Sequence, residues 1–189
     1  MSSLAFDAAA SEITIETKAV GMLAKLAHDL SIQARGATAT ATAADGKLTV
    51  TLRAPVRQLE VRGVKKGSSV DAGVLSASDR AEIERRMREE VLPAAEVVAT
   101  LACDEGRAAL AEDGRRTVPV SGTVEVGRGR ARVTSEATLV VSTERATAEG
   151  RLALDLPALG ITPPKGPLGA FKLRDTVDVV FRVVFGRSN

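Results

Sequence analysis

The pair His28-Asp29 is the first candidate for chemistry in this sequence. A carboxylate beside an imidazole can orient the ring as a general base. Adjacent residues of an extended strand, however, point to opposite faces, so these two side chains cannot meet in the usual geometry. We therefore expect a structural histidine and predict no catalytic residue. An enzyme that uses His28 within a cavity stays open as a second alternative.

Cys103 is the only cysteine of the 189 residues, so no internal disulfide can form. It stands on an alternating segment and is expected to fill space rather than to act as a nucleophile. With His28 as the one imidazole, a zinc site built by the protein is not expected. The sequence predicts neither a metal nor a cofactor.

Basic residues gather in two places and could bind an anionic group. Neither cluster has interleaved aromatic residues for base stacking, and acidic neighbours dilute the charge, so a solvated surface without nucleic acid is expected. A Gly-Pro-rich segment at 160–167 superficially resembles a phosphate loop, but its prolines lack the amide donors of such a cradle. The two clusters are Arg53, Arg57, Arg62, Lys65 and Lys66, and Arg128, Arg130 and Arg132.

One helix is predicted at about residues 76–91. Ser76 and Asp79 have the spacing of a capping pair at its start. Ile83, Met87 and Val91 follow at four-residue intervals and form a narrow apolar stripe among charged residues. This pattern predicts a helix that lies on the side of another structure.

The rest of the chain alternates apolar and polar residues, as strands with one wet face do. An Asp45-Gly46 pair predicts a hairpin turn, and Gly127-Arg128-Gly129 predicts another. Such alternation favours antiparallel strands, and closure would remove exposed edges. We expect an all-β fold in a single domain over residues 1–189, a closed antiparallel lipocalin-like β-barrel of about eight strands with one side helix.

Composition adds limits on location and partners. The net charge of +2 balances 26 basic against 24 acidic residues, which does not favour a polyanion as partner. The N-terminus lacks the basic and apolar stretches of an export signal, and no run reaches membrane-spanning length. A cytoplasmic protein without stable membrane insertion is expected, and a homodimer is left open.

The interior is the strongest functional signal. Trp and Tyr are absent and Phe occurs four times, so inward residues of Val, Leu and Ala size can leave a lumen. Each CH₂ group moved from water contributes about 0.8 kcal/mol, so an apolar chain would bind there. The expected lining residues are Leu48, Val50, Leu52, Val124, Val126, Leu139, Val141, Leu152, Leu154, Val177, Val179 and Phe181, with His28 near them.

Several ordered segments resemble the YceI-like family of polyisoprenoid-binding, lipocalin-like barrels. They are the segment 24–30 with His28, the helical segment 75–92 with Ser78-Asp79-Arg80, the glycine-bearing segment 120–127, Leu159-Gly160-Ile161 and the closing segment 172–181. Family members often carry an export signal and aromatic residues before Gly160 and around Pro93; this chain has Leu159 and Ala94-Ala95 there.

The resemblance implies a barrel that holds a polyisoprenoid, an isoprenoid quinone-like molecule or another long-chain lipid, without catalytic residues. The expected function is that of a carrier or storage protein. The alternative is a ligand-free protein-interaction module with a packed barrel.

Overall fold

Strands make up most of the protein. The computed structural model describes all residues except 1–3, 22–26, 93, 110–113, 167–170 and 188–189. Twelve strands form one sheet, and β3 (Ala19–Val20) and β13 (Lys172–Leu173) form a second, two-stranded sheet. The twelve are β1 (Leu4–Phe6), β2 (Glu12–Glu16), β4 (Leu30–Ala34), β5 (Thr38–Ala44), β6 (Lys47–Pro55), β7 (Leu59–Lys66), β8 (Ser69–Asp71), β9 (Glu96–Asp104), β10 (Arg115–Val126), β11 (Gly129–Val141), β12 (Arg145–Asp155) and β14 (Thr176–Arg187).

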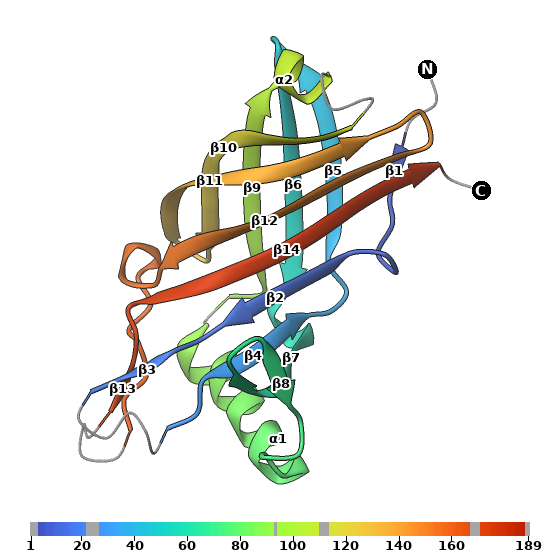
Figure 1. The fold of residues 1–189 in the computed structure, drawn as a ribbon. Helices are drawn as coiled ribbons and strands as arrows, with labels where there is room; N and C mark the ends of the chain where they lie inside the picture. The colour runs from blue at the N-terminus through green and yellow to red at the C-terminus, as the bar shows by residue number, and fades with distance from the viewer. Residues whose placement is uncertain (1–3, 22–26, 93, 110–113, 167–170, 188–189) are drawn as a thin grey trace.

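All ladders of the large sheet are antiparallel. Its strand order is β5-β6-β9-β10-β11-β12-β14-β2-β4-β7-β8, and β1 pairs with β14 beside this path. The sheet curls strongly, so that β10, β11, β12 and β14 cross in front of β5, β6 and β9 (Figure 1). The predicted antiparallel all-β fold is confirmed.

Tight turns set the register of the long hairpins. Asp45 and Gly46 both have positive φ, 53° and 72°, which is the conformation of the two-residue hairpin predicted at this place. Gly127, with φ 58°, opens the predicted turn between β10 and β11. The Ala/Thr-rich run after Gly36 forms β5, the strand that enters this hairpin.

The prediction of a closed barrel of about eight strands is wrong. In the described part of the chain the sheet has β5 and β8 at its ends, and these strands do not pair with each other. Bends at residues 7–11, 35–37 and 56–58 divide what would be longer strands, which raises the number to twelve. A cavity of about 160 Å³ separates the β1–β2 segment from the bend between β4 and β5. The sheet is therefore a half-barrel.

Helix α1 (Ala77–Arg86) begins where the sequence predicts. The Ser76 hydroxyl accepts a hydrogen bond from Asp79 N at 3.1 Å, and the Asp79 carboxylate accepts one from Ser76 N at 3.0 Å. A π-helical turn, Met87–Val91, continues the helix to the predicted end. Met87 is buried and Ile83 packs beside it, so the apolar stripe lies on the sheet. A second short helix, α2 (Glu105–Ala109), was not predicted.

Two side chains of this helical segment satisfy the free edge of β7. Glu84 Oε1 accepts a hydrogen bond from Val61 N at 2.9 Å, and Arg88 donates one to Leu59 O at 3.2 Å. The same two side chains form an ion pair at 3.1 Å. An acceptor and a donor thus stand where a neighbouring strand would supply them, which covers the edge without closing the sheet.

An ion-pair network crosses the outer face of the sheet. Glu16 lies 2.6 Å from Lys65 and 2.8 Å from Arg151, and Arg151 also lies 3.1 Å from Asp178. Burial by itself raises the pKa of the Glu16 carboxyl, but the hydrogen bonds and charges of Lys65 and Arg151 outweigh it and lower the pKa. The network ties β7, β2, β12 and β14 together.

We predict that Glu84→Ala lowers the free energy of unfolding by about 1–3 kcal/mol, because Val61 N and the Arg88 guanidinium lose their acceptor. Glu82→Ala is the matched control on the same helix, since Glu82 pairs with the exposed Arg85 at the surface of the helix and should contribute about 1 kcal/mol or less. Urea denaturation of both variants measures the difference. Equal losses would contradict the edge-capping role.

Acidification should weaken the Glu16 network. A carboxyl with a lowered pKa in the folded state contributes stability above its ordinary value of 4.5 and loses it as pH falls through the lowered folded value. We therefore expect the free energy of unfolding of wild type minus that of Glu16→Gln to shrink toward low pH. Denaturation at a series of pH values tests this. A difference that is constant with pH would show that Glu16 is not titrating as described.

Candidate functional site

The concave face of the curled sheet brings the predicted lining residues together. Residues that pair directly across a ladder point to the same face. Leu48, Val50 and Leu52 of β6 stand opposite Cys103, Leu101 and Ala99 of β9, and this face continues into the other strands through the ladders. All twelve predicted apolar residues lie on it: Leu48, Val50, Leu52, Val124, Val126, Leu139, Val141, Leu152, Leu154, Val177, Val179 and Phe181.

This face is free of charge along its main strands. The inward positions of β6, β9, β11 and β12, and of residues 118–126 on β10, carry no Asp, Glu, Lys, Arg or His. Ser135 and Cys103 are the polar exceptions among them. Such a surface offers dispersion contacts and no acid, base or counter-ion, so it suits an apolar ligand.

Buried side chains form three packed clusters around this face. The helix cluster lies beneath α1 and includes Ile32, Val61 and Met87. The turn cluster surrounds residues 156–161 and includes Val124, Leu154 and Val177 among its members. The hairpin cluster joins β9, β10 and β11 through Cys103, Val118 and Leu139.

Phe181 lies where the three clusters meet, because its side chain packs against all of them. Ile15, Leu92, Val97 and Val179 are shared by the helix and turn clusters. All five of these central residues remain only partly buried. In a solid core, inward residues at the centre would be the most deeply buried ones. Their accessibility shows that solvent reaches between the clusters.

Gly150 makes room for the Phe181 ring. It stands directly opposite Phe181 across the β12–β14 ladder. A Cβ at this position would lie 2.6 Å from Phe181 Cζ and 2.8 Å from Glu136 O. The ring therefore lies over bare backbone, as aromatic side chains do beside strand glycines. This arrangement places the largest inward side chain near the wall and not across the interior.

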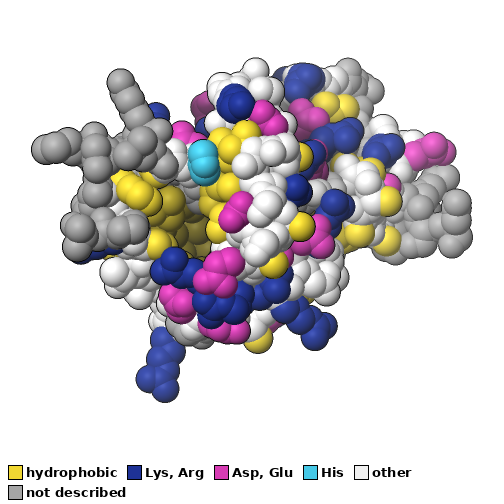
Figure 2. All heavy atoms as spheres, turned by 90° about the horizontal axis from the view of Figure 1, so that it is seen from below, with side chains coloured by type: hydrophobic (Ala, Val, Ile, Leu, Met, Phe, Trp, Pro, Cys, Tyr) yellow, Lys and Arg dark blue, Asp and Glu magenta, His cyan; other side chains and the backbone are white. Residues whose placement is uncertain are grey.

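The hollow opens at the end of the molecule that carries α1, β3 and β13. Figure 2 shows hydrophobic side chains gathered in this recess, with charged side chains on the surface around it. A groove of about 300 Å³ lies between residues of β6, β9, β10 and β11, and its lining combines inward Cys103, Val120 and Ser135 with outward residues such as Lys47 and Ser121.

The predicted lining residues divide into two groups. Val124, Val126, Leu139, Leu152, Leu154 and Val177 are buried in the clusters. Leu48, Val50, Leu52, Val141, Val179 and Phe181 are partly buried and thus reachable. The sequence-based prediction missed Ile15, Leu92, Val97, Ala99 and Leu101, which share the concave region. Four of these five stand in the same alternating pattern; Leu92 follows the helix and has no such signal.

Among the contacts of the described residues, no hydrogen bond or ion pair joins His28 to Asp29. His28 is exposed, and Asp29 Oδ1 accepts a hydrogen bond from Ala19 N at 2.8 Å, which holds the backbone beside β3. Cys103 is buried, and its burial, together with the charge of Asp104, raises the pKa of the thiol. A protonated buried thiol is a poor nucleophile. Residues 24–26, which precede this segment in the family resemblance, lie outside the described residues.

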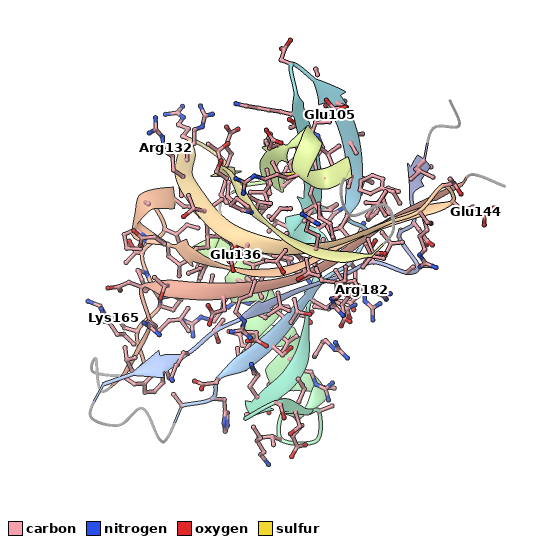
Figure 3. All side chains as sticks on the ribbon, turned by 45° about the horizontal axis from the view of Figure 1, so that its top comes forward. Glu105, Arg132, Glu136, Glu144, Lys165 and Arg182 are labelled. Atoms are coloured by element: carbon pink, nitrogen blue, oxygen red, sulfur yellow. The ribbon has the colours of Figure 1, made fainter. Side chains whose placement is uncertain are left out.

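Most of the first basic cluster is neutralised by acidic partners. Four of its cations form ion pairs: Arg53 with Glu96, Arg62 with Glu12, Lys65 with Glu16 and Lys66 with Asp71. In the second cluster Arg130 pairs with Glu125. Figure 3 shows Arg132 directed away from the sheet. These contacts fit a solvated surface better than a groove for a polyanion.

Two further kinds of site are absent from the part of the chain that the structure describes. No group of three or more His, Cys, Asp or Glu side chains there is arranged to hold a metal ion. Across the same residues, every helix is too short or too polar to cross a bilayer.

Solved structures show where this fold occurs. No protein-family model and no curated protein sequence matches the chain. A polyisoprenoid binding domain from Saccharophagus degradans, implicated in plant cell wall breakdown, is similar with 13% identity over 100% of both chains and a TM-score of 0.65. BcnA of Burkholderia cenocepacia is similar with 15% identity over 95% of this chain and 98% of that one, at a TM-score of 0.63. The chain thus shares its fold with both of these proteins.

Proposed function

We propose that the protein binds a long apolar chain, such as a polyisoprenoid or an isoprenoid quinone-like lipid, in the hollow and acts as its carrier or store. The observation that carries this proposal is the accessible apolar centre. Phe181 contacts all three packed clusters and yet stays only partly buried, in a region without charged side chains on the main strands. An apolar surface that solvent can reach inside a protein is stabilised when a ligand displaces the water.

The shape of the hollow suits a chain better than a compact molecule. Its accessible residues extend along two strands that face each other across the interior, with Leu48, Val50 and Leu52 on β6 and Val179 and Phe181 on β14. We propose that these residues, with Val141, contact the ligand directly. The buried residues Val124, Val126, Leu139, Leu152, Leu154 and Val177 then form the packed wall behind them.

Apolar burial supplies enough free energy for useful affinity. Each CH₂ group transferred from water contributes about 0.8 kcal/mol, so two isoprene units of about five carbons each contribute roughly 8 kcal/mol before the costs of association. The polyisoprenoid-binding description of the Saccharophagus degradans domain supports this class of ligand. This support rests on the fold that the two proteins share.

Native mass spectrometry of the purified protein, followed by organic extraction, tests the proposal. A co-purifying lipid, or uptake of an added polyprenol with one molecule per chain, is the expected result. The packed interaction module predicts a single ligand-free mass that added polyprenol does not change. That result would overturn the carrier proposal.

We predict that Val50→Trp lowers lipid uptake while the fold is kept, because the indole fills space that the ligand otherwise occupies. Thr49→Trp is the matched control, since the neighbouring residue of the same strand faces outward and should leave uptake unchanged. Thermal unfolding and polyprenol uptake are measured on both. In a solid core the Val50 variant would lose roughly 1–3 kcal/mol of stability through overpacking. That loss, in a protein that never holds lipid, would contradict the proposal.

His28→Gln should leave lipid affinity within about tenfold of wild type, because apolar burial rather than proton transfer carries the binding. His28 is exposed and is not paired with Asp29, so no catalytic arrangement is lost. A titration with a fluorescent polyprenol measures the affinity. Complete loss of binding in a folded variant would assign His28 to a polar headgroup site.

A further inference from the structure

A basic face lies on the small sheet of β3 and β13, at the same end as the hollow. Leu173 pairs with Ala19 across this sheet, and its side chain packs inward on the turn cluster. Neighbouring residues of an extended strand point the opposite way. Lys172 and Arg174 therefore lie on the outer face, and so does Lys18, whose carbonyl accepts a hydrogen bond from Arg174 N at 2.7 Å.

A third segment adds another lysine to this face. Lys165 stands directly opposite Lys172 in an antiparallel bridge, held by hydrogen bonds from Leu173 N to Pro164 O and from Gly166 N to Phe171 O. Like charges directly opposite each other in a ladder are destabilising. Figure 3 shows Lys165 projecting outward from this end of the molecule. The fold thus places two lysines side by side, of which Lys172 has an acidic partner and Lys165 extends the positive charge of the face.

The acidic groups nearby leave three of the four cations free. Asp175 pairs with Lys172 at 3.0 Å, and Asp29 is engaged by Ala19 N. Asp155 stands opposite Thr176 at the start of β14. Among the described residues, Lys18, Lys165 and Arg174 have no acidic side-chain partner within ion-pair distance. Most basic residues of the first sequence cluster, in contrast, are paired.

We propose that this basic face, defined by Lys18, Lys165, Lys172 and Arg174, docks the protein on an anionic membrane surface so that lipid enters and leaves the hollow beside it. The role in exchange rests on the proposed function, whereas the docking itself rests on charge. The inner side of the same strand contacts the cluster that contains Val179 and Phe181, so a docked surface would lie next to the hollow. Headgroup charge is the recognised feature, since basic residues gain free energy near anionic lipids.

Vesicle flotation tests the docking. Wild-type protein should float with phosphatidylcholine vesicles in proportion to their phosphatidylglycerol content, and added salt should release it. The triple variant Lys18→Gln, Lys165→Gln, Arg174→Gln should partition about a hundredfold less well, at about fivefold per removed charge. The matched control is Arg116→Gln, Arg128→Gln, Arg132→Gln, which removes three exposed cations from β10, β11 and the turn between them and should bind like wild type.

The outcomes separate docking from lipid binding. Undiminished flotation of the first variant, equal loss in both variants, or equal binding to neutral vesicles would overturn the proposal. The proposal would also be overturned if wild-type protein bound no vesicles but was retained on a nucleic acid column, while the first variant was not retained. Polyprenol uptake measured without membranes should be the same for the first variant and wild type. If wild type floats but takes up no polyprenol, the docking stands and the proposed function fails.

Discussion

The alternation of apolar and polar residues, kept in phase across the ladders of the long strands β6, β9, β10, β11, β12 and β14, is the constraint on which this structure depends. Because opposite residues point to the same face, each long strand adds its apolar side chains to one common surface. A sheet this large cannot leave such a surface in water, so it curls until the surface faces itself. Small aliphatic side chains then line the centre. They fill it incompletely because the sequence has four Phe residues and neither Trp nor Tyr.

The features that depend on local chemistry could be predicted from the sequence. The cap at Ser76 and the turn at Asp45-Gly46 each need a particular residue type at a fixed spacing, so both were recognisable. The inward faces of β6 and β14 followed from period-two alternation. The same alternation argued against a catalytic His28-Asp29 pair, because neighbouring side chains of an extended segment diverge.

Closure of the sheet and the basic face could not be predicted in this way. Whether a sheet closes depends on how its two ends are satisfied, and here Glu84 and Arg88 supply hydrogen bonds to β7 from a helix. Nothing in the pattern of charges along α1 distinguishes Glu84 from Glu82, which stays at the surface. Lys18 and Lys165 are likewise far apart in the chain. They come to one face because residues 171–174 pair with residues 164–166 on one side and with residues 18–20 on the other.

The way in which β7 is covered has a consequence for how this protein would begin to self-associate. A ladder between strands is broken one hydrogen bond at a time, but the cover of β7 consists of two side chains that leave together when the helical segment 77–91 detaches. Detachment uncovers Val61 N and Leu59 O in a strand with one apolar face, and such an unpaired edge is a template for pairing with another chain. Damage to α1 should therefore appear as strand-mediated self-association at high protein concentration, before the body of the sheet unfolds.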